Sequence, residues 1–279
     1  MTEANVSQTP DRREPAQGST YEVVAIRYGT RETSKVDSYH RYPEYGEPDV
    51  KVDMDYFFWV VRGQGRTIVI DTGFDPEVGV RRGRTVTIDP ADALARVGVD
   101  PAQVDQVVVT HFHYDHIGNV DLFPRSEIVV ADRELEFWTG PYATRLLVAS
   151  PTESNEIRRV QDAARDGRVR VVGEQAGIAP GIDAIRVGGH TPGQLVLTVA
   201  TEAGQAVIAS DALHYYEEYE LDRPFAILTD LEEMYRAYDT LRELAEPSGH
   251  ALVAGHDPAV MTRFPGLSDE TAEVAVRIA

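Results

Sequence analysis

The sequence predicts a mixed α/β domain built in layers. Short runs rich in Val and Ile recur along the chain, each bounded by Gly, Pro or Asp, and helical patterns lie between only some of them. The 279 residues include 42% hydrophobic residues, which is ordinary for a globular protein. A chain of this length buries about three quarters of its unfolded surface and needs no cross-links. Many strands with a few helices among them favour layers over a purely parallel sheet.

The two ends of the chain differ in composition. Residues 1–19 are polar, contain prolines and lack an apolar stretch, so we expect a disordered tail and not a secretion signal. Residues 20–279 contain no repeat and no low-complexity linker, and we expect them to form one domain. The longest strongly apolar run is far shorter than the roughly 20 residues of a membrane-spanning helix. We therefore expect a cytoplasmic protein without a membrane partner.

The strands and helices follow from local patterns. Nine runs combine β-branched residues with turn residues at their ends and are predicted as strands: 56–61, 66–71, 106–110, 127–131, 169–172, 184–187, 194–200, 206–210 and 251–254. Helices are predicted over 89–97, 153–165 and 268–279. A further helix is expected to begin at Thr229, with Glu232 completing a capping box, and to stop before Pro247.

Charge and cysteine content exclude several classes of function. The chain has no cysteine, which rules out disulfides, a thiol nucleophile, Cys-ligated zinc and iron–sulfur clusters. It has 27 basic and 46 acidic residues, for a net charge of −19. Such a surface repels nucleic acid and anionic membranes, so neither is expected as a partner.

A histidine cluster is the strongest chemical signal. An apolar run leads directly into the motif HxHxDH at positions 111–116. Because side chains in an extended segment alternate between two sides, His111 and His113 are expected to point the same way. Asp115 and His116 follow in a turn that can bring them back to the same point. Imidazole and carboxylate groups at this spacing indicate a site for a cation such as Zn²⁺.

Three more candidate ligands stand at the ends of later apolar runs. They are His190, Asp211 and His256. Ends of strands hold functional groups rigidly, so these residues have the right setting for binding a metal. Two cations need about six or seven ligands in total, and the combined set supplies them. The pattern therefore indicates a centre for two metal ions.

At this point the chain resembles the metallo-β-lactamase superfamily. The resemblance rests on Asp71-Thr72-Gly73 after a strand, on the HxHxDH motif and on the three later ligands, and it covers residues 21–258. It implies a four-layer αββα sandwich with the metals at one edge of the two sheets. It also implies that Asp71 braces the HxHxDH loop without binding metal.

The resemblance also divides the ligands into two sets. One metal is expected to be held by His111, His113 and His190. The other is expected to be held by Asp115, His116 and His256. Asp211 is expected to bridge the two. The implied cofactor is two Zn²⁺ per chain, with other divalent metals as alternatives.

Such a centre needs no protein nucleophile. Water bound to a metal ion has its pKa lowered to about 7, so a hydroxide bridging the two ions is the expected nucleophile. Asp115 is expected to manage the proton that passes to the leaving oxygen. The expected reaction class is therefore hydrolysis of an ester-type bond in a small molecule.

Within the superfamily, the N-acyl homoserine lactonase-like branch fits best. It is similar in chain length, in the spacing from His190 to Asp211 and in the ending Gly255-His256-Asp257-Pro258. We therefore expect opening of a lactone ring in an N-acyl homoserine lactone or a related lactone, which is quorum-quenching chemistry. Three alternatives remain open: a glyoxalase II-like thioesterase, a hydrolase of another ester or ring-fused lactone such as a pyridoxolactone, and a metal-binding scaffold without activity.

One position departs from that branch. The lactonases commonly place a tyrosine three residues after the bridging aspartate, whereas this chain has His214, followed by Tyr215 and Tyr216. His214 is expected either to donate the hydrogen bond of the missing tyrosine or to form part of the pocket wall. Tyr215 is the alternative donor. The aromatic residues of the segment 39–59 are expected mostly in the core, with some at a pocket or at a homodimer contact.

Overall fold

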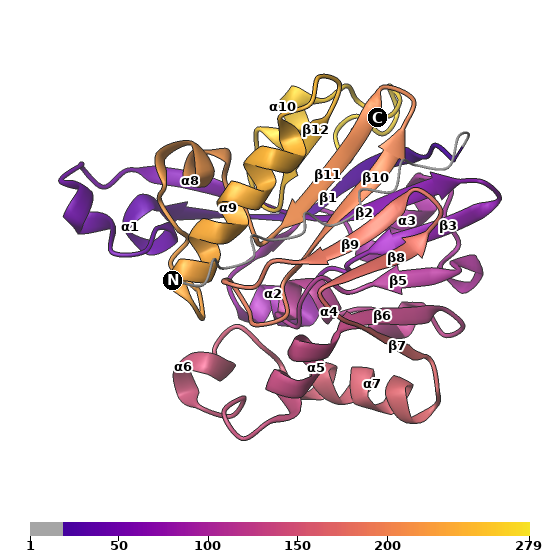
Figure 1. Cartoon of the computed structure of the whole chain (residues 1–279), viewed down its shortest axis with the longest axis horizontal. Coiled ribbons are helices and arrows are strands. Elements are labelled where there is room, and N and C mark those ends of the chain that lie inside the picture. Colours follow the sequence, from indigo (N-terminus) through magenta and orange to yellow (C-terminus); the bar gives the residue numbers. More distant parts are fainter. Residues whose placement is uncertain (1–18) are drawn as a thin grey trace, which may run out of the picture.

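Two β-sheets dominate the computed structural model, which describes residues 19–279 (Figure 1). Within that range, eight strands form the first sheet: β1 (Glu22–Ser34), β2 (Lys51–Gly63), β3 (Arg66–Ile70), β4 (Thr85–Val86), β5 (Gln106–Val108), β6 (Glu127–Ala131), β7 (Val169–Val172) and β13 (Ala275–Arg277). Their order is β13-β1-β2-β3-β5-β6-β7, and β4 pairs with β1. The pairs β3–β5, β5–β6 and β6–β7 are parallel, which brings the ends of β3 and β5 to one edge.

The second sheet is smaller and largely antiparallel. Its strands are β8 (Gln175–Ala179), β9 (Ile182–Arg186), β10 (Leu195–Thr201), β11 (Gly204–Ser210) and β12 (Ala251–Ala254), in the order β12-β11-β10-β9-β8. Only β11 and β12 run parallel among these pairs. Their carboxyl ends therefore lie side by side, and each is followed by one of the predicted metal ligands.

Helices and helical turns connect the strands. The α-helices are α1 (Lys35–Ser38), α2 (Pro76–Arg81), α3 (Pro90–Arg96), α4 (Tyr114–Ile117), α5 (Asp132–Thr139), α6 (Leu146–Ala149), α7 (Ser154–Arg165), α8 (Tyr216–Leu221), α9 (Leu231–Ala245) and α10 (Val260–Arg263). Short 3₁₀ helices cover Tyr42–Tyr45, Pro101–Gln103 and Val120–Leu122. Proline at the first position and a capping aspartate start both α2 and α3.

The core forms two clusters because the strands bury both faces. On β1, Val23 and Ala25 join the cluster that contains β10 and β11, whereas Val24 and Ile26 join the cluster on the other face. This alternation follows from the side-chain period of two in a strand. Helices α3 and α7 cover that other face of the first sheet, and α9 packs on β11 and β12. The result is the predicted αββα arrangement.

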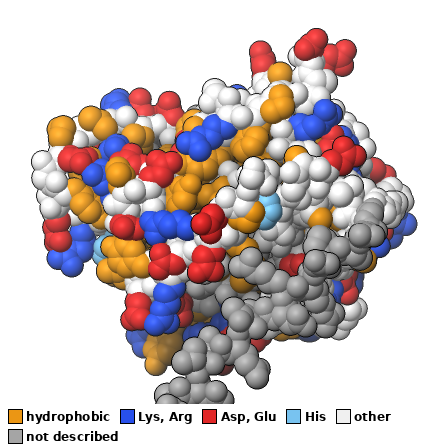
Figure 2. All heavy atoms as spheres, turned by 45° about the horizontal axis from the view of Figure 1, so that its top comes forward, with side chains coloured by type: hydrophobic (Ala, Val, Ile, Leu, Met, Phe, Trp, Pro, Cys, Tyr) orange, Lys and Arg blue, Asp and Glu red, His pale blue; other side chains and the backbone are white. Residues whose placement is uncertain are grey.

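The surface agrees with the charge of the chain. On the face drawn in Figure 2, basic side chains lie scattered among acidic ones and form no extended basic area. None of the helices among residues 19–279 is long and apolar enough to cross a membrane.

The predicted helix over 268–279 is wrong. Residues 275–277 form β13, which pairs antiparallel with β1 so that Val24 lies opposite Arg277. Apolar residues at 274, 275 and 278 fit a helical spacing, but Val274 and Ala275 join one core cluster while Val276 and Ile278 join the other. A free edge of β1 offers backbone hydrogen bonds to an extended segment, and this tertiary pairing overrides the local pattern.

The predicted start of the longest helix also needs correction. Asp230 caps α9 and accepts a hydrogen bond from the backbone nitrogen of Glu233 at 2.9 Å. The Thr229 hydroxyl instead donates to the carbonyl of Gly189 at 2.9 Å. Thr229 therefore anchors the loop that carries His190 and does not cap the helix.

A further difference concerns the N-terminal part. The sequence patterns did not reveal β1, which pairs with β2 along its whole length. The prediction of a disordered tail concerns residues 1–19, of which 1–18 lie outside the described residues.

Candidate metal centre

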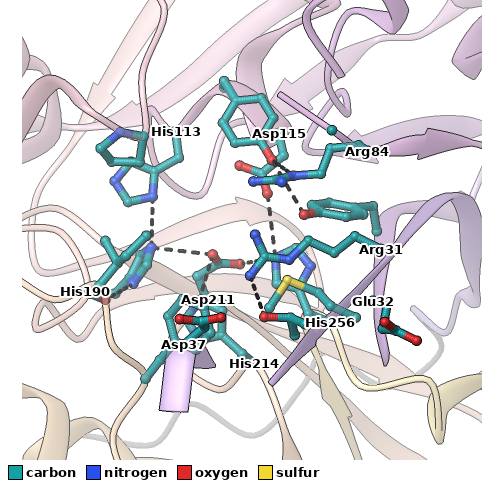
Figure 3. A pocket seen from close by; sticks show the side chains of 18 residues that line it. Arg31, Glu32, Asp37, Arg84, His113, Asp115, His190, Asp211, His214 and His256 are labelled. Carbon is teal, nitrogen blue, oxygen red and sulfur yellow. Dashed lines mark hydrogen bonds and ion pairs between the residues drawn. The ribbon is translucent and has the colours of Figure 1, made fainter. Parts of the chain in front are cut away.

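All seven predicted metal ligands converge at the edge shared by the two sheets, and five of them line a pocket there. The HxHxDH segment follows β5, His190 follows β9, Asp211 follows β11 and His256 follows β12. Each of the seven side chains is buried. Figure 3 shows His113, His190, Asp211 and His256 directed towards a common centre.

The first predicted set is tightly grouped. Ligand atoms of His111, His113, His190 and Asp211 all lie within 4.8 Å of one another. Nδ1 of His113 lies 2.8 Å from Nε2 of His190. Oδ2 of Asp211 lies 3.3 Å from Nε2 of His190 and 3.6 Å from Nε2 of His111. Four donors at these separations can surround a single cation tetrahedrally.

The second predicted set faces the other oxygen of the same aspartate. Ligand atoms of Asp115, His116 and His256 also lie within 4.8 Å of one another. Oδ1 of Asp211 lies 3.2 Å from Nε2 of His116 and 3.0 Å from Nε2 of His256. One carboxylate thus presents each of its oxygens to a different group of imidazoles, which is the geometry of a bridge between two ions.

Hydrogen bonds behind three imidazoles aim their second nitrogens at the centre. Nδ1 of His190 lies 2.8 Å from the carbonyl oxygen of Ile227, and Nδ1 of His256 lies 2.7 Å from the carbonyl oxygen of Asp55. Nδ1 of His116 lies 2.8 Å from Oδ2 of Asp71. A ligand histidine is commonly oriented in this way, with Nε2 left free as the donor.

Two buried nitrogens support the fit of this donor set to metal ions. Nε2 of His111 and Nε2 of His116 have no hydrogen-bond partner within residues 19–279. An unpaired buried polar atom is costly unless something else satisfies it. Neutral imidazoles and carboxylates in this number suit Zn²⁺ or a similar divalent cation.

Asp71 braces the centre from behind, as predicted. Its Oδ2 lies 2.8 Å from Nδ1 of His116 and accepts a hydrogen bond from the hydroxyl of Thr110 at 2.8 Å, while Oδ1 accepts from the Thr110 backbone nitrogen at 2.8 Å. Asp71 has a backbone φ of 61°, and Ser210, which donates to Oδ2 at 3.3 Å, has a φ of 46°. Such positive values are strained for these residues and cluster at functional sites.

Burial and neighbouring charges keep most of these imidazoles neutral. Burial holds the pKa of His111 and His113 well below the usual value, and it lowers that of His190 to about 3. Burial opposes charge on His116 as well, but Asp211, Asp71 and Asp115 together raise its pKa well above the usual value. Neutral imidazoles offer the lone pairs that a metal ion needs.

His214 lies against the centre, whereas Tyr215 turns away from it. Nε2 of His214 lies 3.0 Å from Oδ2 of Asp211, and its ring stacks on Phe225 at a centroid distance of 3.6 Å. Burial opposes charge on this ring, but Asp211 and Glu218 raise its pKa to about 9. The Tyr215 hydroxyl donates to the carbonyl of Asp53 at 3.2 Å, outside the pocket lining. Of the two proposed donors, only His214 therefore faces the pocket.

Glu134 is a supporting residue that the sequence patterns did not reveal. It is fully buried on α5 and accepts hydrogen bonds from the backbone nitrogens of Phe112 at 2.8 Å and Gly193 at 2.9 Å. Phe112 lies between two ligands and Gly193 follows a third. One carboxylate thus ties the HxHxDH loop to the loop of His190. No local motif marks such a residue in a sequence.

The pocket in front of the centre has a volume of about 420 Å³. Besides the ligands it is lined by a mixture of apolar and charged side chains: Arg31, Glu32, Thr33, Asp37, Met54, Tyr56, Arg84, Tyr114, Pro151, Phe225 and Ile227. The hydroxyl of Tyr114 donates towards that of Tyr56 at 3.5 Å. Tyr56 packs edge-on against His256 with ring centroids 5.1 Å apart.

Comparison with known proteins identifies the family. The sequence profile described as Metallo-beta-lactamase superfamily matches residues 55–256, which is most of the chain. The chain belongs to this superfamily. It is 28% identical over 233 residues to the N-acyl homoserine lactonase AttM of Azorhizobium caulinodans, covering 76% of this chain and 86% of that one. It is 26% identical to the N-acyl homoserine lactonase AiiB of Agrobacterium fabrum, covering 74% and 80% of the two chains.

Solved structures share the fold. A crystal structure of a quorum-quenching N-acyl homoserine lactone lactonase superposes with a TM-score of 0.72 at 20% identity, covering 86% of this chain and 94% of that chain. AidC, a dizinc quorum-quenching lactonase, superposes with a TM-score of 0.66 at 19% identity, covering 88% and 90%. The predicted superfamily, its lactonase-like branch, the αββα fold and the hydrolase class are confirmed.

Proposed function

We propose that this protein hydrolyses a lactone ring at a centre of two Zn²⁺ ions. The observation that carries the proposal is the position of Asp211, whose two oxygens face two separate groups of imidazole nitrogens at 3.0 to 3.6 Å. The relatives named as N-acyl homoserine lactonases supply the reaction class. When bound, the ions would polarise the carbonyl and make a water molecule acidic enough to act at neutral pH.

The residues around the centre have separate tasks. His111, His113 and His190 would hold one ion, Asp115, His116 and His256 the other. Asp211 would bridge them and fix their spacing. Asp71 and Glu134 hold the ligand loops in place through buried hydrogen bonds.

Two further side chains would act on the substrate. Asp115 lies at the pocket, with its oxygens 3.8 Å from Nε2 of His116 and of His256. From there it would carry the proton to the leaving oxygen of the ring. His214 would donate a hydrogen bond where the carbonyl oxygen gains negative charge. The buried setting strengthens both contributions, because the local dielectric constant is low.

Metal content and a small substrate panel test this proposal. Protein loaded with Zn²⁺ should contain two ions per chain by elemental analysis. It should open N-hexanoyl homoserine lactone or a pyridoxolactone in preference to the thioester S-lactoylglutathione. Preference for the thioester would replace the proposal with a glyoxalase II-like function. If no ester or thioester were hydrolysed, the protein would be a metal-binding scaffold without activity.

A pair of histidine variants supplies the matched control. His256→Ala should lose one ion and the activity, because its ring faces Asp211 at 3.0 Å. His250→Ala should keep both, because His250 lies outside the pocket lining and its Nδ1 lies 2.7 Å from the carbonyl oxygen of Leu244. Equal metal content in the two variants would contradict the dinuclear assignment.

A further inference from the structure

Two arginines stand together on the pocket wall. Strands β1 and β4 pair antiparallel, with Gly29 opposite Val86 and Thr30 opposite Thr85. Arg31 and Arg84 are the next residues beyond this last pair, and both line the pocket. Figure 3 shows both guanidinium groups beside the carboxylates of the centre. Two like charges on one pocket wall repel each other, so this arrangement needs a reason.

Neither arginine forms an ion pair with an acidic side chain of residues 19–279. Within residues 19–279 most arginines form ion pairs, as Arg82 does with Glu153 at 2.8 Å, but no ion pair involves Arg31 or Arg84. In a chain with 46 acidic residues, two pocket arginines without a carboxylate partner leave a place for an external anion. A desolvated cation gains most from such a partner.

Neutral contacts hold both guanidinium groups in place. Nε of Arg84 donates to the hydroxyl of Tyr114 at 2.8 Å, and Nη1 donates to the carbonyl of Arg82 at 2.7 Å. The rings of Tyr114 and Tyr56 lie 5.7 and 5.9 Å from its guanidinium carbon. Nη2 of Arg31 donates to the hydroxyl of Thr33 at 3.1 Å, while its Nε is buried without a hydrogen-bond partner among the described residues. These contacts orient the two guanidinium groups, and none of them is made to a carboxylate.

Four acidic residues line the pocket, and within residues 19–279 none of them forms an ion pair with Arg31 or Arg84. Asp115 and Asp211 belong to the metal centre, and the other two have partners elsewhere. Glu32 is exposed and pairs with Lys51. Asp37 is exposed, and its Oδ2 accepts a hydrogen bond from the hydroxyl of Ser34 at 3.3 Å at the start of α1. Neither of these two exposed acids therefore neutralises the arginine charges through an ion pair. A guanidinium fork matches the two oxygens of a carboxylate.

We propose that the substrate carries a carboxylate, and that Arg31 and Arg84 are the specificity-determining residues that bind it. This inference rests on the proposed function, because it names the class of lactone that the same site opens. The pocket would hold the ring against the metal ligands and the carboxylate between the two forks. Within a protein of net charge −19, this local pair of cations would also draw an anionic substrate to the site.

A matched pair of substrates tests the proposal on the Zn²⁺-loaded protein. One is γ-butyrolactone carrying a carboxylate on the ring carbon next to the ring oxygen, and the other carries a neutral carboxamide at that carbon. The carboxylate should be preferred at least tenfold in kcat/KM. In Arg31→Gln and in Arg84→Gln this preference should fall at least tenfold, mainly through a higher KM for the carboxylate. Arg84→Lys should retain part of the preference, because it keeps the charge but loses the fork.

The control removes the same charge elsewhere. Arg158 is exposed on α7, so Arg158→Gln should leave the preference for the carboxylate substrate unchanged. The proposal is overturned if the unaltered protein turns over the carboxamide as well as the carboxylate. It is also overturned if Arg31→Gln and Arg84→Gln slow both substrates to the same extent while melting as the unaltered protein does.

A binding measurement separates this inference from the proposed function. If neither lactone is opened, the proposed function fails, and calorimetry with the ring-opened hydroxy-dicarboxylate and its monoamide decides the inference. Binding that favours the dicarboxylate and weakens at least tenfold in Arg31→Gln supports the anion site. Equal binding of the two compounds, or equal binding to the variant, overturns it.

Discussion

Replacing Asp71 tests how the centre is held together. Four contacts end on its carboxylate, from Nδ1 of His116, from the backbone nitrogen and hydroxyl of Thr110, and from the hydroxyl of Ser210. In Asp71→Ala the two hydroxyls can still bond to each other, because they already lie 2.8 Å apart. The His116 nitrogen and the Thr110 backbone nitrogen have no such alternative.

The expected loss of stability follows from those two donors. Each buried donor left unpaired costs about 1–3 kcal/mol. Alanine at the positive φ of this position adds about 1 kcal/mol. Asp71→Ala should therefore lower the free energy of unfolding by about 5 kcal/mol. Asp71→Asn tolerates that backbone conformation and keeps one oxygen, so it should lose about half as much.

Urea unfolding of protein from which a chelator has removed the metal measures the loss of unfolding free energy. Competition with a chromophoric chelator measures metal affinity. A histidine without its orienting partner should bind metal about 10–100-fold more weakly. Asp75→Ala is the control. Asp75 caps α2 and contacts no ligand side chain, so its loss should cost about 1 kcal/mol and leave metal affinity unchanged. If Asp71→Ala is no more destabilising than Asp75→Ala, the brace is not what holds the centre.

Three more predictions concern single residues. Asp211→Ala should leave less than one metal ion per chain by elemental analysis and no turnover, and retention of two ions would refute its role as the bridge. His214→Ala should keep both ions but lower kcat by about 10²–10³-fold, with partial recovery in His214→Tyr, whereas a near-normal rate would make this ring a pocket wall only. Glu156 is buried, both its oxygens lack partners among the described residues, and burial raises its pKa from 4.5 to about 8. The native state therefore holds a proton that the unfolded chain releases above pH 4.5, so stability should fall between pH 4.5 and 8, by at most about 1.4 kcal/mol per pH unit. Glu156→Gln should flatten this fall in urea titrations, and an unchanged pH profile would contradict the assignment.

The metal centre could be predicted from the sequence because its chemistry is local at every position. HxHxDH places four donors within six residues, and each later ligand stands at the end of an apolar run that a strand pattern reveals. The bracing role of Asp71 was expected from the resemblance to the superfamily, which rests in part on Asp71-Thr72-Gly73 after a strand. Composition was equally direct: without cysteine, no thiolate ligand was available.

Pairings between distant segments were not predictable in this way. The end of the chain has a helical spacing of apolar residues, yet it forms β13 because the edge of β1 offers it a partner. Thr229 carries the sequence signature of a helix cap, yet its hydroxyl is drawn to Gly189 and Asp230 caps α9 instead. In both cases a hydrogen bond to a remote backbone group outweighs a local preference.

The sequence by itself thus determined the superfamily, the ligand types and the absence of sulfur chemistry, because each depends on residue identity and short spacing. Only the tertiary structure decided which oxygen of Asp211 faces which imidazoles, that Tyr215 turns away, and that Glu134 joins two ligand loops. It alone placed Arg31 and Arg84 together on the pocket wall. These features depend on strand register and on loops packed across the two sheets, and such long-range contacts leave no periodic trace in the chain.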